Sequence, residues 1–303
     1  MSAATANPKA KPAGRSLDKS ASESVEDSGG ILDDDDHMRG MERVGMEVTG
    51  ITYPFPSVAR VRGRIAPVDP APWMPPNQAI RIAVEEPDGL RPVVRVYSVR
   101  AFYPATSEIE IDFVIHEDDS PAMRWLKAAR PGTILKMIGP RQHFIPLPSG
   151  DKRAAIFADE TAIPAVYAIL SAWPEGLRGE VWIETPDRAA FDELPRPAGV
   201  TLNLLLRPAE VAPGSGNYLI SAAKALPDAK SWTVWAAGER VEMRDLRNHL
   251  RDAGVARADL QVLGYWKKGM SSSDLDRARL AEYEALRRQG LTLENVGDID
   301  LPV

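Results

Sequence analysis

The sequence predicts a protein of mixed class: an N-terminal antiparallel β-barrel followed by a C-terminal α/β domain built on a parallel sheet. The 303 residues, 44% of them hydrophobic, suffice for two domains of ordinary size. Short strands separated by proline and glycine fill residues 44–147, whereas strands alternate with helices over residues 148–270. Residues 1–43 are predicted to be a disordered tail and residues 271–303 a C-terminal helix and tail.

The N-terminal tail shows no hydrophobic period and is rich in Ala, Ser, Lys, Asp and Gly, a composition that cannot bury a core. It contains an acidic run, Asp33–Asp36. Three interpretations of this run stay open: a solvating segment, a remnant of an expression tag, or an iron-binding run. The last would be loose, because carboxylates outside a fold bind metals weakly.

Five strands and one helix are predicted in the barrel segment. The strands lie at Val58–Ile65, Ala79–Val84, Val93–Arg100, Ile109–His116 and Ile134–Ile138. The helix spans Pro121–Ala129, because Ser120 is a good N-cap and proline is favoured at the first helical position. Its apolar stripe, at helical spacing, consists of Ala122, Trp125, Leu126 and Ala129.

In the second segment most predicted strands are followed by a helix, which is typical of a parallel sheet. The strands are placed at Arg153–Ala158, Glu180–Glu184, Val200–Leu206, Ser231–Ala237 and 259–266. The helices are placed at Thr161–Trp173, Arg188–Leu194, Tyr218–Ala225 and Val241–Ala253. A last helix, Asp274–Gln289, is predicted from Ser273 as N-cap, Asp276 three residues later and Gly290 at its end. It either covers a site or docks on the α/β domain.

Composition excludes several classes of protein. A net charge of −6 and a pI near 5.4 give no attraction for polyanions, so no nucleic-acid partner is expected. Neither a run of about eighteen apolar residues nor a secretory signal occurs, which predicts no membrane insertion and a cytoplasmic protein. Because the chain has no cysteine, disulfides, thiolate-held iron–sulfur clusters and cysteine nucleophiles are excluded. Any redox chemistry therefore needs a bound cofactor.

The strand Val93–Arg100 carries a candidate ligand site. Its period of two places Arg95, Tyr97 and Val99 on one face, with Arg95 and Tyr97 roughly 7 Å apart along the strand. A guanidinium binds phosphate through two charge-assisted hydrogen bonds and a phenol ring covers a planar heterocycle, so this pair suits a nucleotide-type flavin. The alternative is structural, with Tyr97 in the barrel core and Arg95 at its rim.

The strand Ile109–His116 presents further polar residues. Its hydrophobic side chains occupy one face, which leaves Asp112, Val114 and His116 on the other. The chain then reaches the N-terminus of the helix at Pro121, whose N–H groups favour an anion such as a pyrophosphate. His116 alone is more often a structural histidine than a ligand. The four histidines do not have the spacing of a metal site, so no protein-bound metal is predicted.

The first strand–helix turn of the α/β segment, Ala158–Thr161, lacks the pattern G-x-G-x-x-G that holds a dinucleotide tightly. The turn is therefore compatible with a transient hydride donor, and equally with a domain that binds no nicotinamide. The structural interpretation, in which Asp159 or Thr161 caps a helix, is compatible with both.

Seven short motifs follow one another along the chain: R-V-Y-S-V-R at 95–100, D-F-V-I-H at 112–116, P-A-M-R-W at 121–125, G-P-R-Q-H-F at 139–144, A-D-E-T-A-I-P at 158–164, W-A-A-G-E at 235–239 and G-Y-W-K-K-G at 264–269. Each is weak alone. In this order and with these gaps they resemble the siderophore-interacting protein family, flavin-dependent ferric-siderophore reductases related in fold to ferredoxin–NADP reductases. The resemblance covers about residues 44–270.

The resemblance implies that the barrel binds FAD and that the α/β domain is NAD(P)H-binding-like, meeting NADPH or NADH as a transient donor. It implies that Arg95 holds the diphosphate, that Tyr97 packs on the isoalloxazine and that Ser98 hydrogen-bonds near flavin N5. Tyr97 and Ser98 are then the catalytic residues. The further cofactor contacts that it implies are Val99, Asp112, His116, Ala122, Met123, Asp159 and Thr161.

Two positions depart from the family pattern: Met123, where serine is usual, and Ala158, where glycine is usual. Without a hydroxyl at Met123 one phosphate donor is lost, so either backbone N–H groups suffice or FAD is held less tightly. The extra methyl group of Ala158 is expected to narrow the approach to the nucleotide.

The resemblance also implies a ferric siderophore as substrate, with ferredoxin as an alternative donor. Lys267, Lys268 and Arg100 are the expected substrate contacts. Cations beside an aromatic pair, Tyr265 and Trp266, suit an anionic ferric complex, although most lysine pairs are merely solvated. We expect a monomer. The competing functions are a generic flavin oxidoreductase and a non-catalytic flavin- or siderophore-binding protein.

Overall fold

The computed structural model describes residues 41–88, 92–116, 119–143, 145, 147 and 150–271, together with 274, 275, 277, 278, 281, 285 and 288. The predictions for residues 1–40, including the acidic run, lie outside the described residues, as do those for Ser273, Asp276 and Gly290. The barrel and the sheet described below pack together within one compact unit, Gly40–Val303. The domain boundaries at residues 147 and 270 stay predictions.

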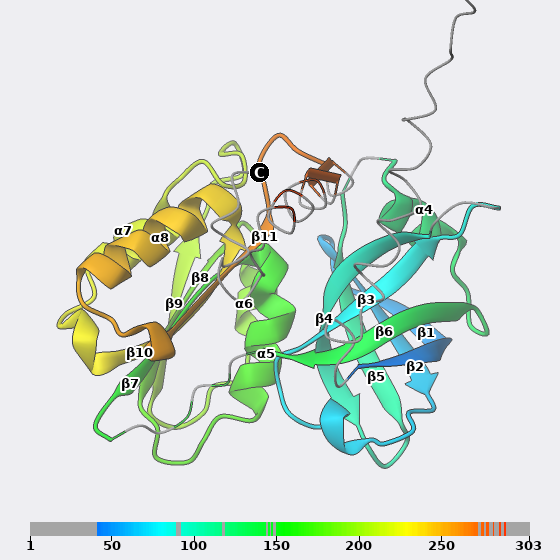
Figure 1. Ribbon diagram of the computed structural model, residues 1–303, viewed down its shortest axis with the longest axis horizontal. Helices are drawn as coiled ribbons and strands as arrows, with labels where there is room; N and C mark the ends of the chain where they lie inside the picture. Colours follow the sequence, from blue (N-terminus) through cyan, green and yellow to red (C-terminus); the bar gives the residue numbers. More distant parts are fainter. Residues whose placement is uncertain are drawn as a thin grey trace, which may run out of the picture. The chain divides into compact units, whose positions relative to one another are not determined.

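Six antiparallel strands close into a barrel in the order β1-β2-β5-β4-β3-β6 (Figure 1). They are β1 (Glu42–Phe55), β2 (Val58–Ile65), β3 (Gln78–Glu85), β4 (Val93–Tyr103), β5 (Glu108–Val114) and β6 (Ile134–Gln142). A short 3₁₀ turn, η1 (Ala71–Trp73), lies between β2 and β3. Alternate residues of β3, among them Ile80 and Ile82, are buried in the barrel core, as the period of two requires.

The first strand, β1, is missing from the sequence-based prediction, and it begins at Glu42, inside the predicted tail. It pairs with β6 on one side and with β2 on the other, so it closes the barrel. Its alternation is visible in Val44, Met46 and Val48, of which the last two are buried. Intervening glycines and polar residues weaken this signal, because they lower the strand propensity of the segment.

A helix, α4 (Pro121–Ala128), follows β5 and packs its apolar stripe on the barrel core, as predicted. Ala122, Met123 and Leu126 are buried there. Trp125 is half-buried, and its ring stacks on Phe113 of β5 with the ring centroids 5.3 Å apart. The helix therefore fixes the position of its N-terminus relative to β5.

The second part of the chain forms a parallel five-stranded sheet in the order β11-β10-β7-β8-β9. The strands are β7 (Arg153–Asp159), β8 (Gly179–Thr185), β9 (Val200–Leu206), β10 (Trp232–Glu239) and β11 (Leu260–Trp266). The order reverses between β7 and β10. In open parallel sheets ligands bind outside the carboxyl ends of the strands at such a reversal.

Helices cover both faces of this sheet (Figure 1). They are α5 (Ile163–Ser171), α6 (Arg188–Asp192), α7 (Tyr218–Lys224) and α8 (Arg240–Asp252), with 3₁₀ turns η2 (Glu160–Ala162), η3 (Ala229–Ser231) and η4 (Arg257–Asp259). Alternate residues of β10 serve the two layers: Val234 packs with α7 and α8, and Trp235 with α5 and α6. The predicted fold class, an antiparallel barrel with a parallel α/β sheet, is confirmed.

One predicted helix is divided in the structure. The helix expected at Thr161–Trp173 is divided, since η2 precedes α5 and α5 ends at Ser171. Near the C-terminus, Ser271 Oγ accepts from the Asp274 N–H at 3.1 Å and donates to the Asp274 carboxylate at 2.6 Å. The cap predicted at Ser273 lies outside the described residues. Leu275 is 4% exposed. Whether this segment covers a site or docks on the α/β domain stays a prediction.

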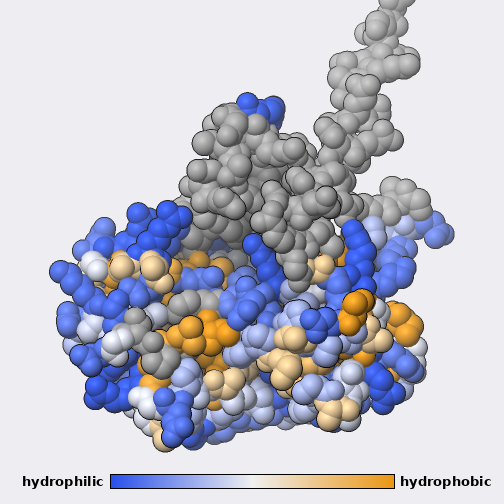
Figure 2. Space-filling view, turned by 60° about the horizontal axis from the view of Figure 1, so that its bottom comes forward, coloured by the Kyte–Doolittle hydropathy of each residue, from blue (hydrophilic) through white to orange (hydrophobic). Residues whose placement is uncertain are grey.

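Hydrophobic patches on the face seen in Figure 2 are separated by hydrophilic surface. Exposed hydrophobic side chains include Tyr53, Val68 and Val96. Scattered exposure of this kind is normal for a protein surface, so it does not by itself identify a partner. Among the residues that the structure describes, no helix is both long and apolar enough to cross a membrane.

Candidate functional site

The β4 residues selected from the sequence lie on two faces of that strand. Arg95 and Tyr97 stand opposite Ile82 and Ile80 of β3, which are core residues, so both side chains start from the inner face of the barrel. Ser98 stands opposite Ala79 and starts from the outer face. The expected pairing of Arg95 with Tyr97, and their separation from Ser98, is therefore found.

Tyr97 belongs to a row of three aromatic side chains. Its ring centroid lies 4.4 Å from that of Phe113, which in turn stacks on Trp125 of α4. Burial raises the pKa of the Tyr97 phenol above its usual value, and the nearby Arg95 charge acts in the opposite direction. The structural interpretation thus holds for one side of this half-buried ring. Its stacking on a flavin stays a prediction.

Arg95 is half-buried at the barrel rim. Its Nη1 donates to the Val94 carbonyl at 2.8 Å. A guanidinium has five N–H donors, of which this bond uses one. Val99, also expected to contact the cofactor, is 4% exposed and packs in the barrel core. The side chain of Val99 therefore has no open face for a ligand.

The N-terminus of α4 offers backbone donors. Ser120 occupies the N-cap position in an extended conformation, but its side chain makes no capping hydrogen bond. By contrast, the side chains of Asp187 and Glu239 cap α6 and α8. The first N–H groups of a helix without a side-chain cap are suited to the phosphates of a dinucleotide-type cofactor.

The substitution of methionine for serine at position 123 has a structural role in this chain. The Met123 side chain is 3% exposed, and its sulfur accepts the backbone N–H of His116 at 3.4 Å. His116 itself is exposed, and its backbone is thereby tied to the start of α4. Because Ala122 and Met123 bury their side chains, only their backbone N–H groups suit a phosphate. Backbone N–H groups and a guanidinium are donors of the kind that bind a diphosphate. That these groups and Arg95 hold the diphosphate of FAD stays a prediction.

Ser98 contacts the parallel sheet through the side chain of Tyr265. The Ser98 hydroxyl and the Tyr265 phenol of β11 are hydrogen-bonded. Burial raises the pKa of Tyr265 to about 12, the bond to Ser98 opposes this, and the charge of Asp159 adds to it. The phenol therefore stays protonated near neutral pH. This bond joins the outer face of β4 to the carboxyl end of β11.

Asp159 ends β7 and caps the turn that follows it. Its Oδ1 accepts from the Thr161 backbone N–H at 2.9 Å, and its Oδ2 accepts from the indole N–H of Trp266 at 2.7 Å. Burial raises the pKa of Asp159. The structural interpretation of Asp159 as an N-cap is confirmed. A contact of Asp159 or Thr161 with the cofactor stays a prediction.

Two small residues border Asp159. An alanine Cβ at Gly238 would lie 2.8 Å from Asp159 Oδ2, so the glycine of the W-A-A-G-E motif permits this close approach. Ala158 is fully buried and packs in the core between the sheet and α5. The expectation that its methyl group narrows an open approach to a nucleotide is wrong, because the methyl group has no exposed side.

Carboxylates line the carboxyl edge of the sheet. Glu184, at the end of β8, pairs with Arg207 at 3.1 Å, and Glu160 pairs with the same guanidinium at 2.5 Å. Burial, with the neighbouring charges of Glu242, Asp159 and Glu160, raises the pKa of Glu184 to about 8. Glu242 accepts two backbone N–H groups at the start of α7. An edge with these carboxylates and no G-x-G-x-x-G loop is compatible with transient rather than tight binding of a dinucleotide.

Arg100 and Asp112 lie away from this site, in an ion-pair cluster. Arg100 is 3% exposed and pairs with Glu110, Asp112 and Glu193, and its guanidinium lies 3.3 Å from the centroid of the Tyr167 ring. Burial raises the pKa of Asp112, whose carboxylate accepts from Arg60 at 2.7 Å. The structure therefore does not support Arg100 as a substrate contact or Asp112 as a cofactor contact. Both side chains are enclosed by partners from the barrel and the sheet.

The two lysines expected to bind substrate follow Trp266 at the carboxyl edge of the sheet. Lys268 is exposed, its ammonium is hydrogen-bonded to Ser215, and its backbone N–H donates to Glu239 at 3.1 Å. Lys267 is half-buried. Tertiary structure thus brings both lysines to the edge that carries Asp159. Their contact with a siderophore stays a prediction.

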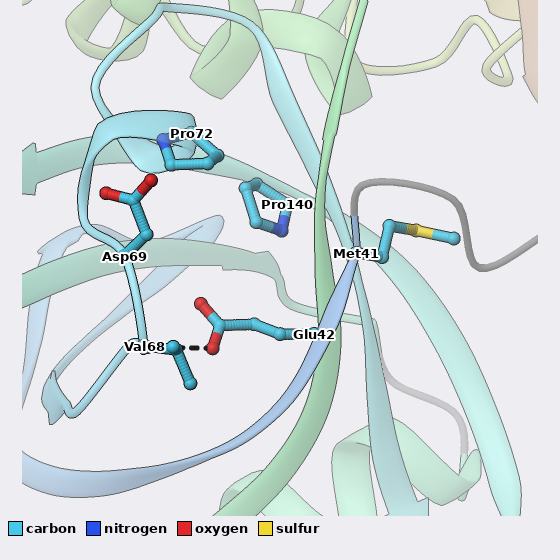
Figure 3. Close-up of a pocket in the computed structure, with 6 residues that line it drawn as sticks. All are labelled: Met41, Glu42, Val68, Asp69, Pro72 and Pro140. Carbon is cyan, nitrogen blue, oxygen red and sulfur yellow. Dashed lines mark hydrogen bonds between the residues drawn. The ribbon is translucent and has the colours of Figure 1, made fainter.

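A pocket at one end of the barrel is a poor candidate for the cofactor. It is lined by Met41, Glu42, Val68, Asp69, Pro72 and Pro140 (Figure 3). Its volume of about 150 Å³ is below the roughly 300–1,000 Å³ of most ligand sites. The Glu42 carboxylate is already bonded to the Val68 N–H and the Trp73 indole. Across the described part of the chain, no group of three or more His, Asp or Glu is placed to hold a metal ion.

The sequence reasoning missed one contact of the site and one ion-pair cluster outside it. The contact of Tyr265 with Ser98 had a weak signal, since the G-Y-W-K-K-G motif was used for the family resemblance and for its aromatic and cationic character, not for a contact with β4. The pairing of Arg60 with Asp112 had a clearer one, because β2 carries arginines and β5 carboxylates at every second position, and these face each other in register. No pattern in the sequence around Glu193 indicates that it joins this ion-pair cluster.

Comparison with known proteins gives matches over both parts of the chain. A model of the siderophore-interacting FAD-binding domain matches residues 65–144, and a model of the siderophore-interacting protein matches residues 152–269. Ferric acinetobactin reductase of Acinetobacter baumannii is 40% identical over 286 residues, which cover 94% of this chain and 99% of that protein. Ferric vibriobactin reductase ViuB of Vibrio cholerae is 30% identical over 64% of this chain and 74% of its own length.

Solved structures show the same arrangement. The siderophore-interacting protein from Acinetobacter baumannii has a TM-score of 0.77 at 40% identity, covering 82% of this chain and 99% of its own. A siderophore utilization protein from T. fusca has a TM-score of 0.66 at 26% identity over 77% of this chain and 96% of its own. The ferredoxin reductase in carbazole 1,9a-dioxygenase has a TM-score of 0.60 at 15% identity over 75% of this chain and 70% of its own, a likeness of fold alone.

Proposed function

Because this chain belongs to the siderophore-interacting protein family, we propose that it is an FAD-dependent ferric-siderophore reductase. The observation that carries the proposal is the 40% identity to ferric acinetobactin reductase, which extends over 94% of the chain and so includes barrel and sheet together. The arrangement of β4 supports it, since Ser98 is hydrogen-bonded to Tyr265 at the carboxyl edge of the sheet, and Arg95 and Tyr97 lie on the same strand.

The barrel is proposed to hold FAD along β4. Arg95 and the N–H groups of Ala122 and Met123 at the start of α4 are the groups for its diphosphate. Tyr97 is the aromatic surface for its ring system, and Ser98 the hydroxyl at the edge of that ring system. Bound FAD supplies the exchange between two-electron and one-electron chemistry that none of this chain's side chains provides.

The sheet is proposed to receive the electron donor. Asp159 and Thr161 end β7, and Tyr265 joins this edge to Ser98, so a donor at the edge would lie beside β4. NADH or NADPH would bind this edge transiently, because the edge lacks a glycine-rich phosphate loop. Ferredoxin is kept as the alternative donor. We further propose that the protein acts in the cytoplasm, where these reductants are found, and as a monomer.

The substrate is proposed to be Fe(III) chelated by a siderophore. Hard oxygen ligands hold Fe(III) more firmly than Fe(II), so one-electron reduction loosens the metal without any protein ligand. The exposed Lys268 and its neighbour Lys267 supply positive charge for an anionic complex. The chain's own contribution is to orient cofactor and substrate, and the iron step needs no general acid or base.

An anaerobic assay tests the function. The purified, flavin-loaded protein is mixed with NADH or NADPH and a ferric siderophore, and Fe(II) is trapped by a coloured chelator. Formation of trapped Fe(II) that depends on protein and flavin is the expected result. Its absence with NADH, NADPH and reduced ferredoxin, together with tight siderophore binding, would refute the proposal in favour of a binding protein. Equal rates with quinones and dyes would refute the siderophore as the specific substrate.

A further inference from the structure

The ion-pair cluster around Arg100 connects the barrel to the sheet. It contains three guanidinium groups and three carboxylates, from Arg60, Arg62, Arg100, Glu110, Asp112 and Glu193. Five of these residues lie on β2, β4 and β5. Glu193 alone of the six comes from the α/β part, directly after α6. It is therefore the group of the cluster that couples the two parts of the molecule by charge.

The contacts of Glu193 are short and paired. Its Oε1 accepts from Arg60 Nη1 at 2.7 Å, and its Oε2 accepts from Arg60 Nη2 at 2.8 Å and pairs with Arg100 Nη2 at 2.9 Å. The hydrogen bond from Arg60 holds the pKa of Glu193 below its usual value. Planar, two-point contacts of this kind restrict direction as well as distance.

Arg100 lies at an irregular point of β4, two residues after Ser98 on the same strand. The pairing of β4 with β5 skips one residue between Val99 and Ala101, which makes Arg100 the extra residue of a bulge. A bulge redirects the side chain of its extra residue. Here the guanidinium lies over the ring of Tyr167 in α5, so Arg100 touches the sheet part through both Tyr167 and Glu193.

The same strand carries Ser98, two residues before Arg100 and roughly 7 Å away along the strand. Ser98 makes its own contact with the sheet part, the hydrogen bond to Tyr265. One short stretch of β4 therefore meets the sheet part at two places. A rotation of the sheet about the barrel would have to change both.

From this geometry we propose that Glu193 is a positioning residue: its ion pairs with Arg60 and Arg100 set the orientation of the sheet against the barrel and so hold the carboxyl edge beside Ser98. Glu193 itself touches neither the proposed cofactor groups nor the donor edge. The consequence for the reaction rests on the proposed function, because electrons pass only if the donor edge lies close to the flavin.

The test compares Glu193→Gln with Glu110→Gln. Each variant removes one carboxylate partner of Arg100, but the Glu110 contacts lie wholly within the barrel. Amide hydrogen exchange of residues 260–266 is measured in the flavin-loaded protein. We expect the amides of residues 260–266 to exchange about tenfold faster in Glu193→Gln and at the wild-type rate in Glu110→Gln. A tenfold change is about what the loss of one hydrogen bond to a charged group gives. Equal exchange in the two variants would overturn the proposal.

A kinetic arm separates positioning from general stability. In Glu193→Gln the rate of flavin reduction by the nicotinamide donor is expected to fall about tenfold relative to Glu110→Gln, while flavin content stays unchanged. Faster exchange without a slower reduction would overturn the role in the reaction. Wild-type protein that is reduced by the donor but yields no Fe(II) would refute the proposed function, and the comparison of the two variants would still stand.

Discussion

Replacing Gly238 by alanine tests how firmly Asp159 is held at the carboxyl edge of the sheet. The new Cβ would lie 2.8 Å from Asp159 Oδ2 and 2.9 Å from its Cγ, well inside van der Waals contact. The carboxylate cannot swing aside without losing its bonds to Thr161 and Trp266, and Asp159 is only 4% exposed. Overpacking of a buried site costs about 1–3 kcal/mol, and each kcal/mol lowers the unfolding temperature of a domain this size by about 2–4 °C.

Thermal unfolding followed by circular dichroism measures this effect, with Gly50→Ala as the matched control. A Cβ at Gly50 meets no atom within 4 Å, so the control is expected to be unchanged or stabilised by about 0.4–1 kcal/mol. Gly238→Ala should unfold several degrees below the wild type. If the two variants unfold at the same temperature, the reasoning that Asp159 is fixed by its hydrogen bonds is refuted.

Three further predictions concern the cofactor, the pH dependence of stability and the substrate. Arg95→Ala is expected to weaken FAD binding about ten- to a hundredfold, by loss of a charge-assisted contact, with Arg95→Lys intermediate; stoichiometric flavin after dialysis of the alanine variant would contradict the assignment. Burial raises the pKa of Glu184 to about 8 from 4.5, so between about pH 5 and 8 the folded protein keeps a proton that the unfolded chain has released, and stability falls as the pH rises. Glu184→Gln should remove that decline in urea unfolding measured at pH 5 and pH 8, and a variant with the wild-type decline would exclude Glu184 as its source. Lys268→Ala is expected to raise the KM for the ferric siderophore about fivefold, as for an exposed ion pair, at constant FAD content; an unchanged KM would show that Lys268 is only solvated.

Local patterns in the sequence were sufficient for most strands and helices. Val58–Ile65 and Val200–Leu206 have the same bounds in the prediction and in the structure, as β2 and β9. These segments are rich in β-branched and aliphatic residues between clear breaks, so their own residues specify a strand. In β1 glycines and polar residues dilute the alternation, and pairing with β2 and β6 on both sides makes the strand.

The same distinction applies to the site. The period of two placed Arg95 and Tyr97 on one face of β4 and Ser98 on the other, and the structure has them so. The period of two could not predict that the Tyr97 ring would contact the Phe113 ring or that Ser98 would be hydrogen-bonded to Tyr265, because these partners are far apart in the chain. Asp159 as an N-cap was accessible from the sequence, since a cap acts within its own turn.

Arg100 shows most clearly where sequence reasoning ends. The family resemblance implied a substrate contact for Arg100, yet in the structure its guanidinium pairs with Glu193 and lies over the ring of Tyr167. The sequence by itself determined the two-part fold, the residue types along β4 and the need for a bound redox cofactor. The tertiary structure alone decided which charges are enclosed and which face a ligand, because burial and ion pairing depend on strand register and on the packing of segments distant in the chain.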